Sequence, residues 1–297
     1  MENNKRAVVD RRGFLKLTGV GLSGFVLQPS DQAFASTLGE EEVAILYDAS
    51  KCIGCRACEE ACKECNNLPP EPVHPSDLSA ITWNLIKQRK GVGQSEWPFF
   101  NHQCMHCTDA ACVMVCTTGA LYKDKKGFVA VDEDKCNGCG YCTQFCPFGV
   151  PDLKDVNLIT GEAKVGKCIF CCQNQPQEGV GRVACVEACP TGALTLDWRE
   201  SQLEVARDRI AQLKADGYSK AMLYGESEAG GLHRLSILLD EPSAYGLPVD
   251  PQGPITFSSV WQKIIQPLGE VALGATVLGV IAAFFVTRRS IRMEEVE

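Results

Sequence analysis

The longest apolar stretch of the chain lies near its C-terminus, from Leu268 to Thr287. It carries a single charge, Glu270, close to its start, and its twenty residues are enough to cross the hydrocarbon core of a bilayer. Three arginines follow between residues 288 and 292, whereas Lys263 is the only basic residue shortly before the stretch. Because basic residues concentrate on the cytoplasmic side, this pattern predicts a transmembrane helix with a cytoplasmic C-terminus. A core or interfacial helix is the alternative.

A shorter and milder apolar run near the N-terminus follows Arg11-Arg12 and ends at Leu27. It is about half as long as a membrane span requires, and Ala33-Phe34-Ala35 comes after it. Paired arginines, an apolar region and a small-residue cleavage site are typical of a twin-arginine signal peptide. We predict such a signal over residues 1–35, cleaved after Ala35, with a permanent N-terminal anchor as the weaker alternative.

Between these two segments the hydrophobic residues form only short patterns. Residues 127–132 and 193–197 are predicted to be short strands, and the mixture of charged and apolar residues from Glu200 to Ala215 predicts a solvent-exposed helix. Insertions at residues 66–101 and 150–167 are interpreted as irregular loops, and residues 225–267, rich in Gly and Pro, as an extended tail.

These patterns predict four parts along the chain. They are a signal peptide at 1–35, a cysteine-rich domain at 36–200, a helix and extended tail at 201–260, and a transmembrane anchor with a basic cytoplasmic end at 261–297. The predicted fold class is α+β, because short strands and short helices alternate without a long regular run.

Cysteine content changes the picture more than any other feature of the composition. The 297 residues include eighteen cysteines, far above the usage of a typical soluble enzyme. The formal net charge is -8 and no basic stripe accompanies it, which argues against a nucleic-acid partner.

Sixteen of the cysteines form four groups of four with related spacing. The groups are Cys52-xx-Cys55-xx-Cys58-xxx-Cys62, Cys104-xx-Cys107-xxxx-Cys112-xxx-Cys116, Cys136-xx-Cys139-xx-Cys142-xxx-Cys146, and Cys168-xx-Cys171 followed after thirteen residues by Cys185-xxx-Cys189. The first and third match the bacterial ferredoxin run, in which three thiolates bind one 4Fe-4S cube and the fourth binds another. The other two follow the same plan with a longer middle loop. We therefore predict four 4Fe-4S clusters.

An internal repeat supports a common plan for these groups. Cys116 is followed by Thr-Thr-Gly-Ala-Leu, and Cys189 is followed by Pro-Thr-Gly-Ala-Leu. Structural zinc sites are one alternative, because they also use paired C-x-x-C motifs, and disulfides are another, because exported proteins meet an oxidising compartment. Cys65 and Cys172 remain outside the groups; either could compete with its neighbour Cys62 or Cys171 as a ligand, and an inert buried thiol is the preferred interpretation.

The remaining residues show no catalytic pattern. The chain has no C-x-x-C-H haem motif, and its four histidines, His74, His102, His106 and His233, all lie outside the apolar stretch. His106 could tune a cluster through a hydrogen bond, although a structural role is the preferred interpretation. The chain is therefore predicted to carry electrons without performing substrate chemistry.

From about Ile45 to the C-terminus the sequence resembles the four-cluster ferredoxin-type subunits of membrane-bound respiratory oxidoreductases. The signal peptide and Cys104-Met105-His106-Cys107 are similar to the iron-sulfur protein of the periplasmic nickel-iron hydrogenase 2 system. Tyr245 to Pro251, Val260-Trp261-Gln-Lys263 and Gln266-Pro267-Leu268 resemble the beta subunit of respiratory formate dehydrogenase. The signal favours the hydrogenase. This resemblance implies tandem ferredoxin-like modules with irregular insertions, plus the C-terminal transmembrane helix.

The resemblance also implies which cysteines share a cluster. The implied sets are set A (Cys52, Cys55, Cys58, Cys189), set B (Cys62, Cys168, Cys171, Cys185), set C (Cys104, Cys107, Cys112, Cys146) and set D (Cys116, Cys136, Cys139, Cys142). Lys63 and Thr117 stand where proline is common after the last cysteine of such runs, which leaves the potentials of the joined clusters open.

The sequence thus predicts an electron-transfer subunit on the periplasmic face of the cytoplasmic membrane, exported by the twin-arginine route. Its expected partners are a periplasmic catalytic subunit, with a nickel-iron hydrogenase as the main hypothesis, and an integral membrane quinone-reactive subunit. A formate dehydrogenase or another molybdenum or tungsten enzyme is the alternative catalytic partner. A disulfide-stapled secreted protein is the alternative from a different class.

Overall fold

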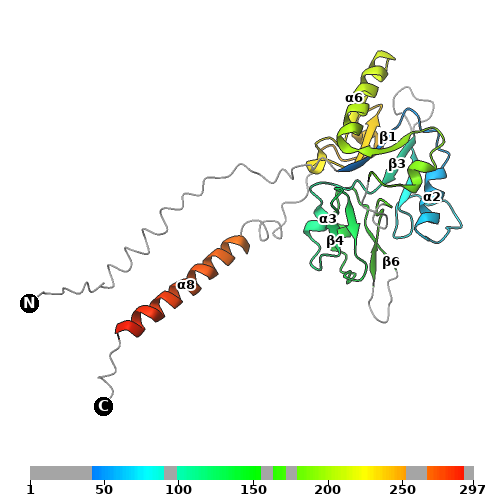
Figure 1. Ribbon diagram of the computed structural model, residues 1–297. Coiled ribbons are helices and arrows are strands. Elements are labelled where there is room, and N and C mark those ends of the chain that lie inside the picture. The colour runs from blue at the N-terminus through cyan, green and yellow to red at the C-terminus, as the bar shows by residue number, and fades with distance from the viewer. Residues whose placement is uncertain (1–41, 90–98, 155–162, 172–178, 252–265, 291–297) are drawn as a thin grey trace, which may run out of the picture. The chain divides into compact units, whose positions relative to one another are not determined.

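The structure is a computed structural model that describes residues 42–89, 99–154, 163–171, 179–251 and 266–290 (Figure 1). The predicted signal peptide lies outside the described residues, as does Cys172. All sixteen cysteines of sets A to D lie within them.

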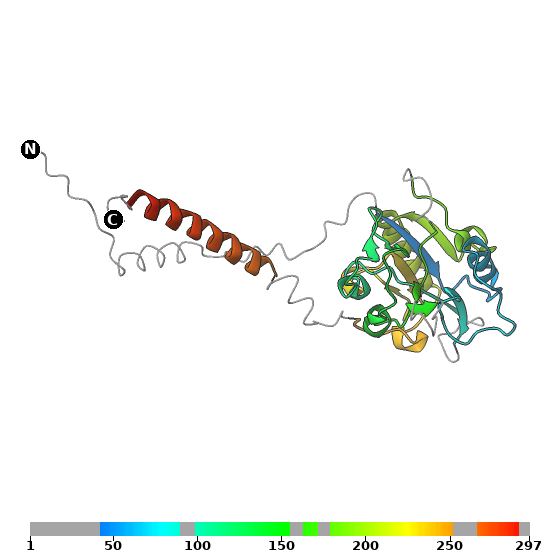
Figure 2. The same ribbon diagram turned by 90° about the horizontal axis from the view of Figure 1, so that it is seen from below.

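A four-stranded sheet forms the centre of the cysteine-rich body. Its strands are β1 (Val43–Asp48), β8 (Leu194–Trp198), β9 (Met222–Tyr224) and β10 (Arg234–Leu238), in the order β8-β1-β10-β9. β1 pairs with β10 in parallel and with β8 in antiparallel, and β10 pairs with β9 in antiparallel. Figures 1 and 2 show the blue β1 beside the yellow β10. Every residue of these two strands is buried, as expected for strands with both faces covered.

Helix α6 (Arg199–Ala215) packs on β1, β8 and β10. Leu203, Ala206 and Leu213 are buried in this contact, while Val205 is exposed. The predicted helix is therefore present, but the prediction that it is solvent-exposed is wrong for the face that carries Leu203. The apolar residues were too few to mark a buried face clearly, because Ala206 and the aliphatic part of Arg199 share in it.

The predicted extended tail is also corrected by the structure. Within the described residues 201–251, the chain supplies β9 and β10, and β10 lies between β1 and β9. The boundary predicted after residue 200 therefore does not separate two bodies, because one sheet contains strands from both sides of it. Gly230 and Gly231 precede β10, and these glycines led us to interpret a short strand as part of a linker.

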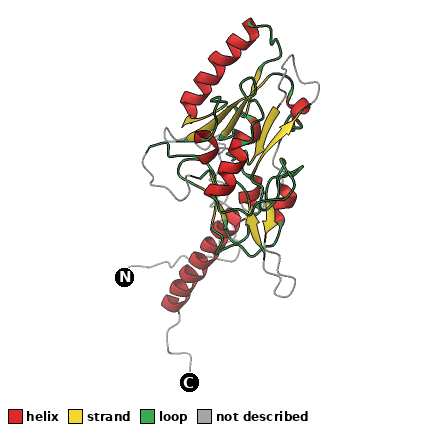
Figure 3. Ribbon diagram, turned by 90° about the vertical axis from the view of Figure 1, so that its right-hand side faces the viewer, coloured by secondary structure: helices red, strands yellow, loops and turns green. Residues whose placement is uncertain are grey.

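Shorter helices and hairpins lie beside the sheet (Figure 3), and the cysteines lie on these helices or in the loops next to them. Three antiparallel hairpins pair β2 (Asn84–Gln88) with β3 (Phe99–Gln103), β4 (Leu121–Lys123) with β5 (Val129–Val131), and β6 (Asp152–Lys154) with β7 (Lys164–Gly166). The short helices are α2 (Ala57–Cys65), α3 (Ala111–Met114), α4 (Tyr141–Phe145) and α5 (Ala184–Glu187), with 3-10 turns η2 (Glu228–Gly230) and η3 (Pro242–Tyr245). Strands β5 and β8 confirm the two short strands predicted from the sequence, whereas the hairpins β2/β3 and β6/β7 occupy parts of the insertions that we interpreted as irregular.

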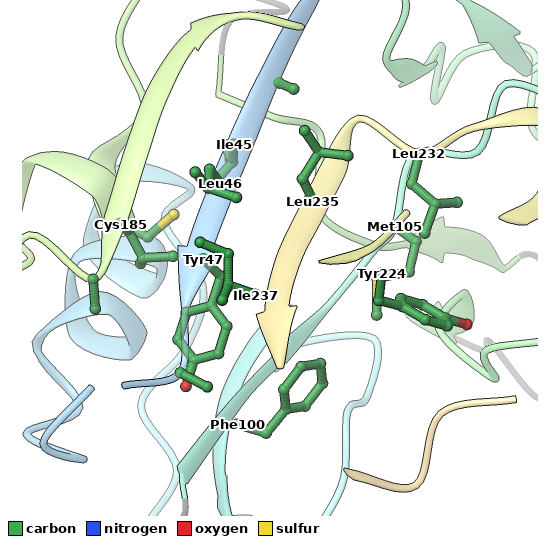
Figure 4. Packing of buried hydrophobic residues seen from close by; sticks show 14 of the residues in the cluster. Ile45, Leu46, Tyr47, Phe100, Met105, Cys185, Tyr224, Leu232, Leu235 and Ile237 are labelled. Atoms are coloured by element: carbon green, nitrogen blue, oxygen red, sulfur yellow. The ribbon is translucent and has the colours of Figure 1, made fainter. Parts of the chain in front are cut away.

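The main core fills the space between the sheet and the cysteine-bearing segments (Figure 4). Side chains along β1 alternate between the two faces of the sheet. Leu46 lies on the face that α6 covers, and Ile45 and Tyr47 lie on the opposite face. Tyr47 packs edge-on against Phe100 with 5.7 Å between ring centres, and its hydroxyl donates to the Phe99 carbonyl oxygen at 2.8 Å. One face of the central sheet thus meets α6 and the other faces the cysteines.

His233, fully buried at the start of β10, gives the fold a predictable sensitivity to acid. Its Nδ1 donates to the Val43 carbonyl oxygen at 2.8 Å, while Nε2 lies 3.7 Å from Glu42 Oε2, beyond hydrogen-bonding distance. Burial, followed by the charge of Lys123, lowers the pKa of His233 to about 3. The unfolded chain, with a histidine pKa of about 6.5, therefore binds this proton more readily, so stability is full above that pH and is lost as the pH falls.

We expect His233 to reduce the free energy of unfolding by about 2–3 kcal/mol between pH 6.5 and pH 4.5, at about 1.4 kcal/mol per pH unit. Anaerobic urea unfolding at several pH values measures this slope. The variant His233→Gln should show a shallower slope over the same interval; equal slopes in the two proteins would contradict the assignment to His233.

The predicted C-terminal helix is present as α8 (Gln266–Ser290). Among the described residues, however, no helix carries an apolar run long enough to cross a membrane, so the transmembrane span predicted from Leu268 to Thr287 is not confirmed.

Candidate cluster-binding site

The structure gathers the cysteines into groups whose members are those of sets A to D. In set A, burial raises the pKa of Cys52, and nearby Cys189 and Cys55 raise it further. Burial likewise raises the pKa of Cys58 to about 12, with contributions from Glu59, Cys52 and Cys189. All four thiols line one small pocket, although Cys189 is 131 residues further along the chain than Cys58.

Set D is built in the same way at another place. Burial raises the pKa of Cys142 to about 11, and Cys136, Cys139 and Cys116 add to the shift. These four thiols line a second small pocket, which Leu121 and Tyr141 help to enclose.

Sets B and C lie deeper. Burial raises the pKa of Cys62 in set B, and Cys168, Cys185 and Cys171 are the largest charged neighbours. In set C, burial raises the pKa of Cys107, and Cys104, Cys112 and Cys146 follow as neighbours. Neither set contains an exposed cysteine, whereas Cys55 of set A and Cys139 of set D are exposed.

Cysteines of different sets also approach one another, and this fixes the order of the sets. Cys58 of set A raises the pKa of Cys185 of set B, and Cys104 of set C raises that of Cys168 of set B. Cys142 of set D likewise raises the pKa of Cys112 of set C. In each case burial is the larger cause of the raised pKa. The sets therefore follow one another as A, B, C and D, with an exposed thiol at each end of the series.

The first C-x-x-C loop of each of the four groups shares one backbone feature, a left-handed residue before the second cysteine. The residues are Gly54 (φ 70°), His106 (φ 47°), Gly138 (φ 71°) and Phe170 (φ 67°). Glycine adopts this conformation freely, whereas a side chain there costs about 1–2 kcal/mol. The rings of His106 and Phe170 pack edge-to-face, with 4.9 Å between ring centres, and Phe170 stacks on Phe128 at 5.2 Å. This shared conformation could not be predicted from the sequence, because only two of the four residues are glycine.

His106 connects set C with set B. Its Nδ1 accepts the Val129 amide N–H at 3.1 Å, so the proton resides on Nε2, which lies 3.5 Å from Cys168 Sγ. Burial, then the charge of Lys167, lowers the pKa of His106 well below its ordinary value and keeps the ring neutral. The geometry therefore allows a neutral N–H donor to the Cys168 sulfur, the tuning role that we ranked below a structural one.

The internal repeat is visible in the hydrogen bonds of its two cysteines. The Leu121 amide donates to Cys116 Sγ at 3.4 Å, and the Thr118 hydroxyl lies 3.7 Å from the same sulfur; Thr191 stands at 3.7 Å from Cys189 Sγ. Burial raises the pKa of both thiols, but these donors outweigh it, so each pKa is lowered. Both repeats thus stabilise a thiolate, the form that binds iron.

Two lysines accompany the inner sets, Lys167 buried and Lys123 half-buried. Lys167 Nζ donates to the carbonyl oxygens of Val129 and Cys168 at 2.7 and 2.8 Å, and Lys123 Nζ donates to that of Cys107 at 2.9 Å. Burial lowers the pKa of Lys123 to about 8, while Glu42 and the thiolates of set C oppose the shift. A buried cation needs a compensating anion, so these lysines suit a negatively charged group held by the cysteines. They were not among the residues predicted from the sequence, because no local motif marks them.

The donor set distinguishes between the groups that could bind. Within the described residues, no three Cys, His, Asp or Glu side chains converge closely enough to hold one metal ion. Four thiols per set with the spacing of ferredoxin runs suit a 4Fe-4S cluster, in which cysteine sulfurs bind the irons. Every described cysteine is a free thiol, which gives no support to the disulfide alternative.

Two cysteines, Cys65 and Cys172, lie outside sets A to D. Cys65 is exposed at the end of α2 and contributes to the raised pKa of Cys171, which is due first to burial. The prediction that it is buried is therefore wrong. Cys172 lies outside the described residues.

Comparison with known proteins agrees with this chemistry. A family model described as a 4Fe-4S dicluster domain matches residues 95–199, and one described as a 4Fe-4S binding domain matches residues 43–64. The iron-sulfur subunit of the nitrate-inducible formate dehydrogenase of Escherichia coli (strain K12) is 38% identical over 255 residues, which is 81% of this chain and 83% of that protein. The chain belongs to the family of ferredoxin-like 4Fe-4S iron-sulfur subunits.

Other members of this ferredoxin-like family are similar over comparable lengths. The formate dehydrogenase iron-sulfur subunit of Haemophilus influenzae is 34% identical over 86% of this chain and 84% of that protein. The uncharacterized ferredoxin-like protein YdhX of Escherichia coli (strain K12) is 32% identical over 72% of this chain and 92% of that protein. As an iron-sulfur subunit of this family, the chain binds 4Fe-4S clusters and transfers electrons, and it is not the catalytic subunit.

Proposed function

We propose that this chain is the iron-sulfur subunit of a formate dehydrogenase, or of a related molybdenum or tungsten oxidoreductase, and that sets A to D each bind one 4Fe-4S cluster. The observation that carries the proposal is the series of four cysteine sets with an exposed thiol at each end, found in a relative of formate dehydrogenase subunits. Bound clusters supply one-electron redox chemistry.

The residues of the chain position and insulate this series. Buried sets B and C keep solvent from the middle, and the exposed ends at Cys55 and Cys139 give two places where partners can exchange electrons. A catalytic subunit would meet one end and an integral membrane quinone-reactive subunit the other, in either direction of flow. The predicted twin-arginine signal would place this assembly on the periplasmic face of the cytoplasmic membrane.

A nickel-iron hydrogenase as the catalytic partner is the second candidate. The signal peptide and Cys104-Met105-His106-Cys107 favoured it in the sequence. The relatives reported above support formate dehydrogenase better. Two of them are formate dehydrogenase iron-sulfur subunits that match this chain over more than four-fifths of their own length.

The test is anaerobic purification of the full chain from membranes with the proteins that accompany it. Iron and acid-labile sulfide should reach about sixteen of each per chain, as four cubes require. Formate-dependent dye reduction by the complex would support the first candidate, and hydrogen-dependent reduction would support the second. About eight irons per chain would overturn the assignment of four clusters, and reduction with neither donor would overturn both partner assignments.

A further inference from the structure

Arg234, the first residue of β10, is among the largest fully buried side chains of the protein. It is 1% exposed and pairs in register with Ile45 of β1, on the sheet face that carries Tyr47. Its guanidinium carbon lies 5.3 Å from the centre of the Tyr47 ring, and Nη2 donates to Asn101 Oδ1 at 2.6 Å. Its position inside the protein is therefore fixed by two independent contacts.

The charge of Arg234 lacks an ordinary partner. Its Nε and Nη1 donate to no group among the described residues, and none of the ion pairs formed by these residues includes it. An arginine remains protonated in proteins, and a buried cation without an anion is strongly unfavourable. The chain must therefore bring negative charge near this side chain by another means.

Apart from burial, the groups that most affect the pKa of Arg234 are Tyr47 and three cysteines of two different sets. Burial lowers the pKa of Arg234, and Cys185, Tyr47, Cys58 and Cys168 oppose this shift, so cysteines of sets A and B lie near one guanidinium. In return, Arg234 lowers the pKa of Cys58 and Cys185 against the larger effect of burial. One side chain thus stands between the two sets.

Asn101 makes a second link from Arg234 to set A. Its Nδ2 donates to Cys58 Sγ at 3.4 Å and to Asn84 Oδ1 at 2.6 Å, while its Oδ1 accepts from Arg234. Because the guanidinium can only donate, the amide oxygen must face it and the N–H must face the sulfur. Arg234 therefore holds a hydrogen-bond donor in place on Cys58.

We propose that Arg234 is the shared counter-charge of the clusters on sets A and B and raises the reduction potentials of both. This role rests on the proposed function, since it requires clusters on these cysteines. A cluster becomes more negative when it accepts an electron, so a fixed cation stabilises the reduced form more than the oxidised form. The Asn101 N–H on Cys58 acts in the same direction. The three cysteines with the largest effect on the pKa of Arg234 all belong to sets A and B.

The variant Arg234→Gln tests this role in the purified anaerobic complex, because it removes the charge and keeps a hydrogen-bonding side chain. Redox titration followed by electron paramagnetic resonance should show two clusters titrating at lower potential and the other two unchanged. Arg234→Lys, which keeps the charge, should shift them less. Arg199→Gln is the matched control, because Arg199 is an equally buried arginine that donates to the backbone oxygens of Leu232 and Glu226.

Unchanged potentials in Arg234→Gln with full iron content would overturn the role, as would the same shift in Arg199→Gln. If Arg234→Gln loses iron, Arg234→Lys should restore it, and loss of iron in both would show that the side chain acts through packing and not through charge. Iron content and formate oxidation in the wild-type complex test the proposed function separately, so its failure would be recognised before any variant is compared.

Discussion

Replacing Cys62 by serine is expected to remove about four irons per chain and to reduce electron transfer from the catalytic partner to quinone by more than about 100-fold. Cys62 is buried on α2, and its neighbours are Cys168, Cys185 and Cys171, so it completes set B. In the proposed relay, set B holds the second cluster, so an electron that enters at set A passes it before it reaches sets C and D. Losing this cluster therefore interrupts the path at an inner position.

The matched control for this variant is Cys65→Ser, three residues further along the same helix. Cys65 is exposed, and we expect its replacement to leave iron content and quinone reduction close to those of the wild type. Iron assay, electron paramagnetic resonance and donor-to-quinone activity of the anaerobic complex measure both variants. Because Cys65 also affects the pKa of Cys171 of set B, the reverse result is chemically sensible: iron lost in Cys65→Ser and kept in Cys62→Ser would make Cys65 the ligand.

The grouping of cysteines could be predicted because local spacing determines local geometry. In each group a left-handed residue precedes the second cysteine, the third cysteine lies on a short helix, and the fourth lies on that helix or within two residues of its end. The family resemblance then implied which distant group supplies the fourth thiol. The structure brings together the same sets, and ligation of clusters by all sixteen thiols stays a prediction until iron is measured.

The surroundings of the sets could not be predicted, because they come from segments far apart in the chain. Arg234 lies in a region that we interpreted as an extended tail, yet it reaches cysteines 49 or more residues earlier. The pairing of β10 with β1 joins residues about 190 positions apart, and no periodic pattern in either strand encodes its partner. Lys123 and Lys167 give no local signal either, since a lysine at or just after the end of a short strand is ordinarily solvated.

Replacing Gly127 by alanine is expected to destabilise the protein by about 3 kcal/mol or more. Gly127 adopts φ +88° in the turn between β4 and β5, and an added Cβ would lie 2.0 Å from His233 Cε1. The left-handed backbone alone costs about 1–2 kcal/mol for alanine, and forced overpacking adds about 1–3 kcal/mol. The ring cannot yield cheaply, because it is fully buried and its Nδ1 is bound to the Val43 carbonyl oxygen at 2.8 Å. The added methyl group would thus push on the residue that leads into β10 and Arg234.

Gly119→Ala separates the steric effect from the backbone effect. Gly119 has φ +67°, and no atom lies within 4 Å of the position of an added Cβ, so only the cost of about 1–2 kcal/mol for the backbone is expected. Anaerobic urea unfolding, followed by circular dichroism, should therefore rank the wild type above Gly119→Ala and Gly119→Ala clearly above Gly127→Ala. Equal losses of stability in the two variants would mean that His233 can move aside. Glycine at position 127 would then be required by its backbone conformation alone, and not by the close approach of the β4/β5 turn to His233.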